Sequence, residues 1–340
     1  MPDTPQDAAA EDPLLPPTPV VRHQPSTMRG RILIIRGGAI GDFILTLPVL
    51  AALRRQFPAA SLEVLGYPQV VALAAAGGLA DTVRPIESRP LAGFFARRGV
   101  LDPALSEEFA GIHVVVSYLF DPDEIFRDNL AKVTQAQIIQ GPHRPDGARP
   151  VHATDQLLEP LQRLAIFGAD PVPRIRLAAA SPSKRPCLAI HPGSGSERKN
   201  WPEDRWAALL RHVLGTLPVD LLLVGGEAEG GRLARLASTL PTGRAEILRS
   251  APLTEVAVRL AGCVGFVGHD SGITHLAAAV GLPGLALWGA TDAAIWRPRS
   301  DVFSLVACDA GLEFLGVATV AAALSGALPD WLARERVLVE

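Results

Sequence analysis

An aspartate follows a glycine-rich turn at the start of the first strand-and-helix pattern of the chain. The stretch "IIRGGAIGDFILTLPVL" (34–50) predicts a strand, a turn and a helix, with Asp42 at the mouth of the helix. A helix start of this kind usually seats a phosphate, which a carboxylate would repel. Asp42 is therefore interpreted either as a helix cap or as a base that takes a proton from a hydroxyl group.

A second polar group follows a predicted strand in the other half of the chain, within "GHDSGITHLAAAVGLP" (268–283). Asp270, Ser271 and Gly272 begin a helix whose free backbone N–H groups could hold a diphosphate. His275 lies one turn further along, on the same side of that helix. Taken alone, a plain helix cap explains these residues slightly better than a ligand site does.

The glycine loop "HPGSGSERKNWP" (191–202) also follows a predicted strand. Ser194 and Ser196 lie in this loop, and Lys199 could place a positive charge on a phosphate held there. The ordinary alternative is a flexible surface turn with a solvated lysine.

Two further strand ends have polar residues. In "LLVGGEAEGGRL" (222–233), Glu227 follows a glycine pair, where a carboxylate commonly binds ribose hydroxyls; an acid favoured by the helix dipole is the alternative. In "WGATDAAIWRP" (288–298), Thr291 could line the same mouth. Each signal is weak alone, but together the four loops predict a site for a nucleotide diphosphate.

The bulk composition narrows the class of protein. The chain has 340 residues, of which 48% are apolar and 20% charged, which is typical of a globular protein large enough for two domains. Its three cysteines form no CxxC pair, so neither a zinc knuckle nor a disulfide framework is predicted, and a reducing cytoplasm fits. The apolar runs fall short of the ~18 residues that a membrane span needs.

Short apolar runs that alternate with helical patterns predict strand–helix units and parallel sheets. The first strand is expected at 31–36 and the first helix at 46–57; a helix at 153–168 and a proline-rich linker precede a second run of such units. Ligands of open sheets bind at the carboxyl ends of strands, so a cleft between two sheets would lie between Asp42 and the second-half loops. The expected organisation is a disordered proline-rich tail (1–27), a first domain (28–172) and a second domain (173–340).

Five stretches resemble the motifs of glycosyltransferase family 9, the heptosyltransferases that build the inner core of lipopolysaccharide: "GGAIGDFILTLPVL", "HPGSGSERKNWP", "GGE", "DSGITHLAAA" and "WGAT". The resemblance covers about residues 31–300, and the first half matches only at its start. It implies a GT-B architecture, an α/β fold in which two Rossmann-like parallel-sheet domains face each other across a cleft. It also implies an inverting sugar transfer, with an ADP-sugar, most often ADP-heptose, as the donor substrate and with no metal and no cofactor.

The resemblance also assigns roles to individual residues. The position of the family's proposed catalytic base falls on Asp42, on the acceptor side of the cleft. Gly38 and Gly41 would let a sugar approach the backbone closely. Negative charge on the departing diphosphate would be stabilised by Lys199 and the helix start. The family's donor-site positions fall on Lys199, Glu227, Asp270, Ser271, Gly272 and His275.

The implied partners are a nucleotide-sugar donor and a glycan or lipid-linked acceptor, and a net charge of −3 does not favour nucleic acid. The segment "RPLAGFFARRGV" (89–100) places Phe94 and Phe95 among arginines, which would suit an anionic lipid surface. A surface loop with two buried phenylalanines is the equal alternative. We therefore expect a cytoplasmic protein that touches the inner face of the plasma membrane if this segment binds lipid.

Three other functions fit the sequence less well. A nicotinamide-dependent oxidoreductase needs G-x-G-x-x-G after a strand, and neither "GGAIGD" nor "GSGSER" has that spacing. A nucleotide-sugar epimerase shares the GT-B fold but transfers its sugar to no acceptor. A non-catalytic relative would be expected to lose Asp42 or Lys199, and this chain has both.

Overall fold

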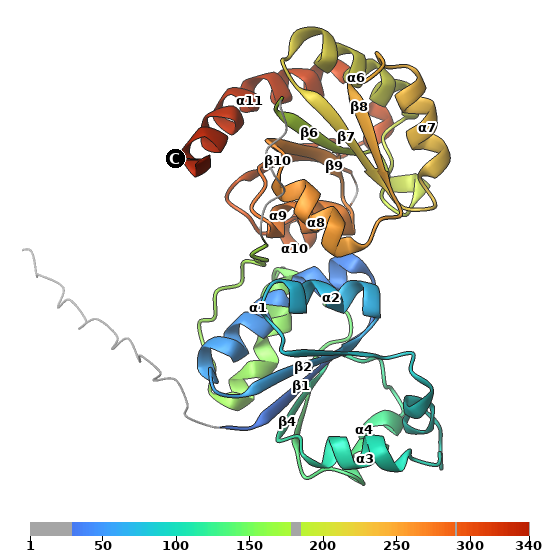
Figure 1. Ribbon diagram of the computed structural model, residues 1–340, viewed down its shortest axis with the longest axis vertical. Coiled ribbons are helices and arrows are strands. Elements are labelled where there is room, and N and C mark those ends of the chain that lie inside the picture. The colour runs from blue at the N-terminus through green and yellow to red at the C-terminus, as the bar shows by residue number, and fades with distance from the viewer. Residues whose placement is uncertain (1–28, 178–184, 290, 340) are drawn as a thin grey trace, which may run out of the picture.

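The computed structural model describes residues 29–177, 185–289 and 291–339, and the tail predicted for residues 1–27 lies outside them. The chain forms two lobes stacked along the long axis of the molecule, each built on a parallel sheet with helices on both faces (Figure 1). The domain boundary expected between residues 172 and 173 stays a prediction.

The sheet of the first lobe is parallel throughout. Its strands are, in spatial order, β3 (Thr82–Pro85), β2 (Ser61–Gly66), β1 (Arg31–Arg36), β4 (Val114–Ser117) and β5 (Gln137–Gln140). The central strand β1 is covered on both faces, which explains why it is a continuous aliphatic run rather than an alternating one. β2 and β4 pair with opposite edges of β1, so the order in which strands are added changes sides at β1. Such a switch point favours a ligand site at the carboxyl end of β1.

The helices of the first lobe differ from the prediction at two places. The helices and 3₁₀ turns are α1 (Ile40–Gln56), α2 (Pro68–Ala76), η1 (Arg89–Phe95), α3 (Pro103–Ala110), α4 (Ile125–Ala131), α5 (Ala153–Leu158) and η2 (Glu159–Leu164). The first helix begins before the predicted residue 46, because Asp42 in its first turn accepts the backbone N–H of Ala39. Pro48 is therefore inside the helix, where it donates no backbone hydrogen bond. The helix predicted over 153–168 breaks into α5 and η2, since Pro160 cannot supply the next N–H.

The second lobe repeats the plan with a wider parallel sheet. Its strands are, in spatial order, β11 (Phe303–Ala307), β10 (Gly284–Trp288), β9 (Gly265–His269), β6 (Cys187–His191), β7 (Asp220–Gly225) and β8 (Ala245–Arg249). Its helices and 3₁₀ turns are η3 (Glu197–Lys199), α6 (Glu203–Thr216), α7 (Gly230–Ser238), α8 (Leu253–Ala261), α9 (Gly272–Ala279), α10 (Ala293–Trp296), η4 (Leu312–Phe314) and α11 (Val317–Val339). The apolar side of α6 is buried as its spacing predicts, from Trp206 to Leu214.

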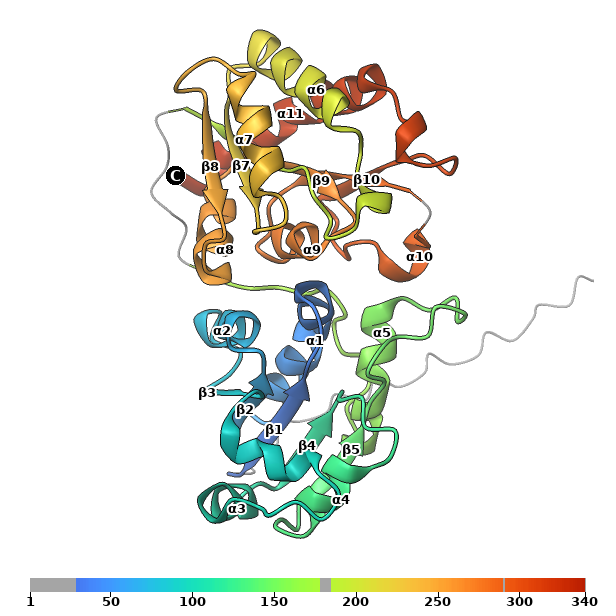
Figure 2. The same ribbon diagram turned by 90° about the vertical axis from the view of Figure 1, so that its right-hand side faces the viewer.

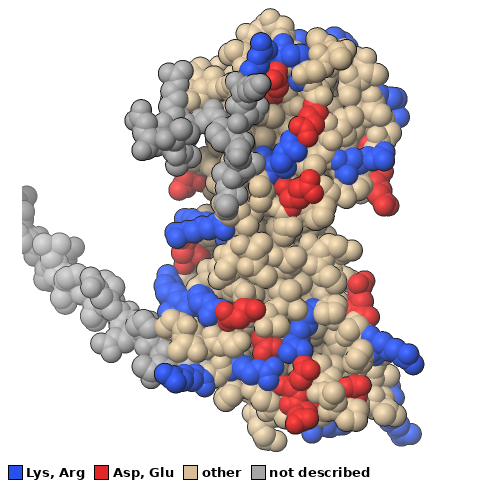
Figure 3. Space-filling model, in the orientation of Figure 1, with Lys and Arg blue, Asp and Glu red and all other residues tan. Residues whose placement is uncertain are grey.

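The lobes meet where α1 and α2 pack on α9 and α8, and one hydrophobic cluster runs through this seam (Figure 2). The backbones are close at its centre: a Cβ added to Gly272 would stand 2.8 Å from Cβ of Ile40 and 2.9 Å from N of Gly41. The segment that connects the lobes also contacts α9, because Ile175 donates its N–H to the carbonyl of Ala279 at 2.8 Å. On the face seen in Figure 3, charges of both signs cover the lobes and the waist between them is mostly uncharged.

Candidate active site

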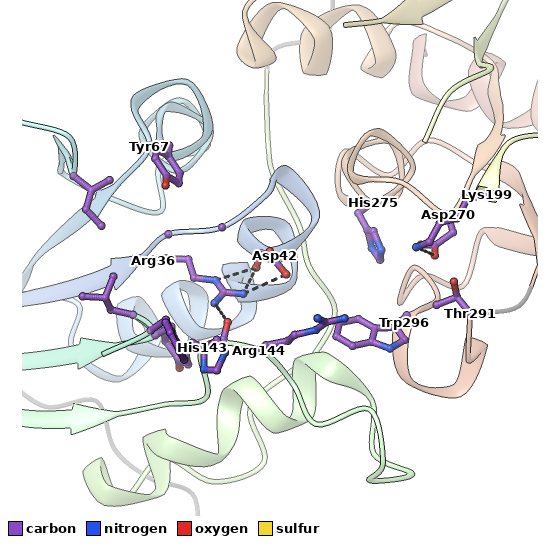
Figure 4. A pocket seen from close by; sticks show the side chains of 16 residues that line it. Arg36, Asp42, Tyr67, His143, Arg144, Lys199, Asp270, His275, Thr291 and Trp296 are labelled. Carbon is purple, nitrogen blue, oxygen red and sulfur yellow. Dashed lines mark hydrogen bonds and ion pairs between the residues drawn. The ribbon is translucent and has the colours of Figure 1, made fainter. Parts of the chain in front are cut away.

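A cavity of ≈ 570 Å³ lies between the lobes (Figure 4). One wall is formed by the carboxyl ends of β1 and β4 and the start of α1, and the other by α9, α10 and the loops after β6 and β9. The candidate base Asp42 and the candidate donor lysine Lys199 thus lie on opposite walls of one space. The predicted site residues in its lining are Gly38, Asp42, Lys199, Asp270, His275 and Thr291.

Asp42 lies in the first turn of α1 with 34% of its side chain exposed. Its Oδ2 accepts the backbone N–H of Ala39 at 3.0 Å, so the residue helps to close the helix start. Gly38 makes room for this carboxylate: its φ is +99°, and a Cβ there would stand 2.7 Å from Asp42 Oδ2. Asp42 therefore contributes to the helix cap and also faces the cavity.

The other carboxylate oxygen of Asp42 faces a buried arginine that the sequence reasoning missed. Arg36 ends β1 with 1% of its side chain exposed, and its Nη2 lies 3.6 Å from Asp42 Oδ1. Burial lowers the pKa of Arg36, and the nearby charge of Asp42 opposes that shift. A signal was present in the sequence, because a charged residue at the inner end of an aliphatic strand needs a partner when it is buried.

Lys199 is held at the cavity by an ion pair. Its Nζ donates to Asp270 Oδ2 at 2.6 Å, and 44% of the lysine side chain is exposed, against 13% for the aspartate. A second cavity of ≈ 640 Å³ shares Lys199, Asp270 and Thr291 with the first and is also lined by Ser196. The ion pair therefore stands where the two spaces meet.

His275 lies in the same wall on α9 and is 6% exposed. Burial lowers its pKa to about 4, although Asp270 and Asp42 act in the opposite direction. At neutral pH this imidazole is neutral, so it can take part in a hydrogen bond but brings no charge to a phosphate.

Three predicted residues lie at the seam rather than in the cavity wall. Ser271 caps α9, since its Oγ accepts the N–H of Thr274 at 3.2 Å. Gly41 and Gly272 pack against each other across the lobes. Ser271 thus caps the helix and the two glycines lie in the contact between the lobes, and their roles at a ligand site stay predictions.

The two serines of the glycine loop shape the turn that presents Lys199. The Ser194 hydroxyl lies 2.8 Å from the carbonyl of Ser196 and 2.8 Å from Asn200 Oδ1. Ser194 is therefore occupied within its own loop, whereas Ser196 lines the second cavity.

The glutamate expected near the ribose is exposed, and its neighbour along the chain is buried instead. Glu227 is exposed to solvent, whereas Glu229 is 9% exposed, and its Oε2 accepts the N–H of Gly226 at 2.9 Å. Gly193 fits against this side chain so closely that a Cβ there would stand 2.3 Å from Glu229 Cγ. Glu229 thus lies between the glycine loops after β6 and β7, a position that sequence reasoning missed because both acids follow the same glycine pair.

The first lobe adds lining residues that no motif indicated. Tyr67 and Phe120 are 38% and 67% exposed and present aromatic surface to the cavity. The Phe120 ring lies 4.6 Å from that of His143, and Arg144 extends toward Trp296 of the opposite lobe (Figure 4). Aromatic walls with a few polar groups are typical of small-molecule sites.

The segment proposed for membrane contact is only partly exposed. Phe94 in η1 is fully buried, and Phe95 is 41% exposed with its ring 4.8 Å from that of Phe126. In the part of the chain that the structure describes, no helix is both long and apolar enough to cross a membrane. The same residues contain no group of three His, Cys, Asp or Glu side chains placed to hold a metal ion.

Known sequences are similar to parts of this chain. Residues 165–310 match the sequence model of glycosyltransferase family 9 (heptosyltransferase). Lipopolysaccharide heptosyltransferase 1 of Pseudomonas aeruginosa is 35% identical over 126 residues, which is 37% of this chain and 34% of that protein. Lipopolysaccharide heptosyltransferase 3 of Escherichia coli is 24% identical over 292 residues, 77% of this chain and 83% of that protein. The match to heptosyltransferase 1 thus spans about a third of that relative.

Solved structures are similar over both lobes. The ADP-heptose lipopolysaccharide heptosyltransferase II of E. coli superposes with a TM-score of 0.73 at 16% identity, over 88% of this chain and 99% of that one. A family 9 glycosyltransferase of Veillonella parvula superposes with a TM-score of 0.73 at 16% identity, over 90% and 99%. The predicted fold of two Rossmann-like domains is thereby confirmed.

Proposed function

We propose that this chain, whose residues 165–310 match the glycosyltransferase family 9 model, is an inverting, metal-independent glycosyltransferase. The proposed donor is an ADP-sugar, with ADP-heptose favoured, and the proposed acceptor is a lipopolysaccharide core or a related glycan. One observation supports this most directly: Asp42 from the first lobe and Lys199 from the second line the same cavity from opposite sides.

On the acceptor side, Asp42 acts as the base. The acceptor hydroxyl oxygen attacks the anomeric carbon of the donor, and its proton passes to the Asp42 carboxylate as the new C–O bond forms. The bond between the anomeric carbon and the diphosphate oxygen breaks, and ADP leaves on the opposite face of the sugar. The exposed third of the Asp42 side chain is what allows a hydroxyl group to reach it.

On the donor side, Lys199 stabilises the charge that develops on the leaving diphosphate. Its ammonium is already oriented by Asp270 at 2.6 Å, so little reorganisation is needed when the phosphate arrives. Neutral His275 supplies a hydrogen bond without adding charge to this wall. Glu227 is the proposed carboxylate for the ribose hydroxyls, because its exposed side chain can reach a ligand, whereas Glu229 is packed between two glycine loops.

The acceptor binds against the first lobe, where Tyr67 and Phe120 offer their faces to a sugar ring. Contact with the inner membrane surface through residues 89–100 would place a lipid-linked acceptor at the cavity. Co-sedimentation with vesicles, with and without anionic lipid, tests this contact; recovery of the protein in the supernatant under both conditions removes it.

A donor screen tests the proposed function. Purified full-length protein is heated with ADP-, UDP-, GDP- and CMP-sugars, and the melting temperature is recorded for each. A ligand at a hundred times its Kd adds about 2.7 kcal/mol to the free energy of unfolding. We expect an ADP-sugar alone to raise the melting temperature, and release of ADP from it to require an added glycan acceptor. Sugar conversion without an acceptor would instead identify an epimerase.

A further inference from the structure

Arg36 is a charged residue whose position the proposed reaction does not yet explain. It lines the cavity from the end of β1, but with 1% of its side chain exposed it offers almost no surface to a substrate. We propose that Arg36 is a positioning residue, which fixes Asp42 and the loop before α5 relative to each other. This inference rests on the proposed role of Asp42 as the base.

The hydrogen bonds of Arg36 connect three segments of the first lobe. From β1, its Nη1 donates to the carbonyl of His143 at 2.7 Å. Its Nε and Nη2 lie 3.4 and 3.3 Å from the backbone carbonyl of Asp42, and Nη2 also faces the Asp42 carboxylate at 3.6 Å. A planar guanidinium can reach these acceptors at once, whereas the single ammonium of a lysine cannot.

The guanidinium of Arg36 also lies beside an aromatic ring. Its guanidinium lies 5.8 Å from the centre of the Tyr118 ring, and the Tyr118 hydroxyl donates to the carbonyl of Leu157 at 2.6 Å. A buried ion pair adds little to stability compared with an apolar side chain of similar volume, because two charges lose their water. A requirement for stability alone therefore does not explain an arginine here.

The positioning matters because both oxygens of Asp42 are held. Oδ2 accepts the Ala39 N–H at 3.0 Å, and Oδ1 faces Arg36. The loop that Arg36 holds by the His143 carbonyl also places His143 and Arg144 in the cavity wall. Arg36 therefore fixes the distance between the base and the wall against which the acceptor lies, and misplacement by about 1 Å can cost roughly 100-fold in rate.

A double-mutant cycle tests the proposal. The turnover number and the donor KM are measured for the full chain and for Arg36→Met, Arg36→Lys, Asp42→Asn and the double variant Arg36→Met/Asp42→Asn. We expect Arg36→Met to lower kcat by about 10- to 100-fold, less than loss of the base itself, with the donor KM unchanged. Arg36→Lys should recover part of the loss. In the Asp42→Asn background, Arg36→Met should cost little more, because both changes disable the same group.

Arg54 provides a matched control, on the same helix as Asp42. It also holds a carbonyl and a carboxylate, those of Ala60 at 3.0 Å and Asp81 at 2.7 Å, but away from the cavity. Arg54→Met should leave kcat unchanged.

Two results would overturn the proposal: full turnover in Arg36→Met, or an equal loss of kcat in the presence and absence of the Asp42 carboxylate. If Arg36→Met does not fold, Arg36→Lys is compared in the same two backgrounds and decides the question in the same way. Full turnover in Asp42→Asn would instead refute the proposed base, and the role given to Arg36 with it.

Discussion

The two lobes contribute to the cavity in different ways. The second lobe contributes short loops at strand ends, with Lys199, Asp270 and His275 close to one another. The first lobe contributes a single carboxylate from a helix start and otherwise side chains from scattered loops, such as Tyr67 and Phe120. The family match, over residues 165–310, lies mostly on the second lobe. In the proposed function, the diphosphate is a group that ADP-, UDP- and GDP-sugars share, so the groups that bind it recur as motifs, whereas acceptor walls follow the shape of each acceptor.

The lobes also differ in their buried polar groups. His191, His269 and His275 in the second lobe are all at most 6% exposed, and burial lowers the pKa of each. The corresponding site of the first lobe has Arg36, which stays charged. Lowering the pH should therefore destabilise the second lobe first. Substitution of Asp42 should lower turnover without changing donor binding.

Loss of the Asp42 carboxylate should have the largest effect. Asp42→Asn keeps the size of the side chain and removes the proton acceptor, so turnover should fall by about 10²- to 10⁴-fold. Binding of the ADP-sugar, measured by calorimetry, should be unchanged because the proposed donor site lies on the other lobe. A large loss of donor affinity in this variant would place Asp42 in the donor site and remove the difference between the lobes.

Lys199→Ala should lower kcat by about 100-fold, which corresponds to roughly 3 kcal/mol of transition-state stabilisation. The partial exposure of this lysine puts the effect at the lower end of the range for preorganised donors. Lys132, which donates to Asn129 Oδ1 at 2.7 Å in the first lobe, is the matched control, and Lys132→Ala should leave kcat unchanged. Equal rates for Lys199→Ala and the parent would show that the diphosphate is stabilised elsewhere.

His269 should make the second lobe sensitive to acid. Its Nε2 accepts the N–H of Trp201 at 2.8 Å and its Nδ1 donates to the carbonyl of Gly193 at 3.2 Å, so the folded protein requires the neutral ring. Burial lowers its pKa to about 3. The unfolded chain takes up this proton below about pH 6.5, so the free energy of unfolding should fall from there toward pH 3, by up to about 1.4 kcal/mol per pH unit for this residue.

Urea unfolding at pH 7 and pH 5 measures this dependence. His269→Gln should reduce the difference between the two pH values, whereas His212→Gln, at an exposed position on α6, should not change it. An unchanged difference in His269→Gln would show that other groups cause the acid sensitivity.

The smallest effect should separate the two glutamates. Glu227→Gln should raise the donor KM by about tenfold, as expected for the loss of a charge-assisted hydrogen bond of about 1.5 kcal/mol. Glu229→Gln, at the buried position between the two glycine loops, should leave it unchanged. The reverse result would assign the nucleotide carboxylate to Glu229.

The sequence predicted best those elements that are determined by residues close together in the chain. The strand at 31–36 is β1, and the aliphatic run and the turn that follows it are sufficient to define it. The start of α1 was placed too late, because it depends on a side-chain contact between Asp42 and Ala39 rather than on apolar spacing.

Residues far apart in the chain explain the remaining differences. Phe94 is buried against Phe109, with ring centres 5.2 Å apart, and a local pattern of arginines and aromatics does not reveal that contact. Glu229 and Glu227 follow the same glycine pair, and only the loop after β6 distinguishes them. The first-lobe wall of the cavity could not be predicted, since Tyr67, Phe120 and Arg144 belong to three separate loops that share no motif.

The bare-backbone contact between Gly41 and Gly272 has a consequence for protein engineering. The second lobe can be exchanged for that of a relative only if the incoming lobe also has a glycine at the position of Gly272, since a methyl group there would meet Ile40 at 2.8 Å, whereas a Cβ on Gly41 would meet Gly272 at 3.5 Å, an ordinary contact distance. A chimaera must therefore be selected first for this glycine, and only afterwards for the residues that line the cavity.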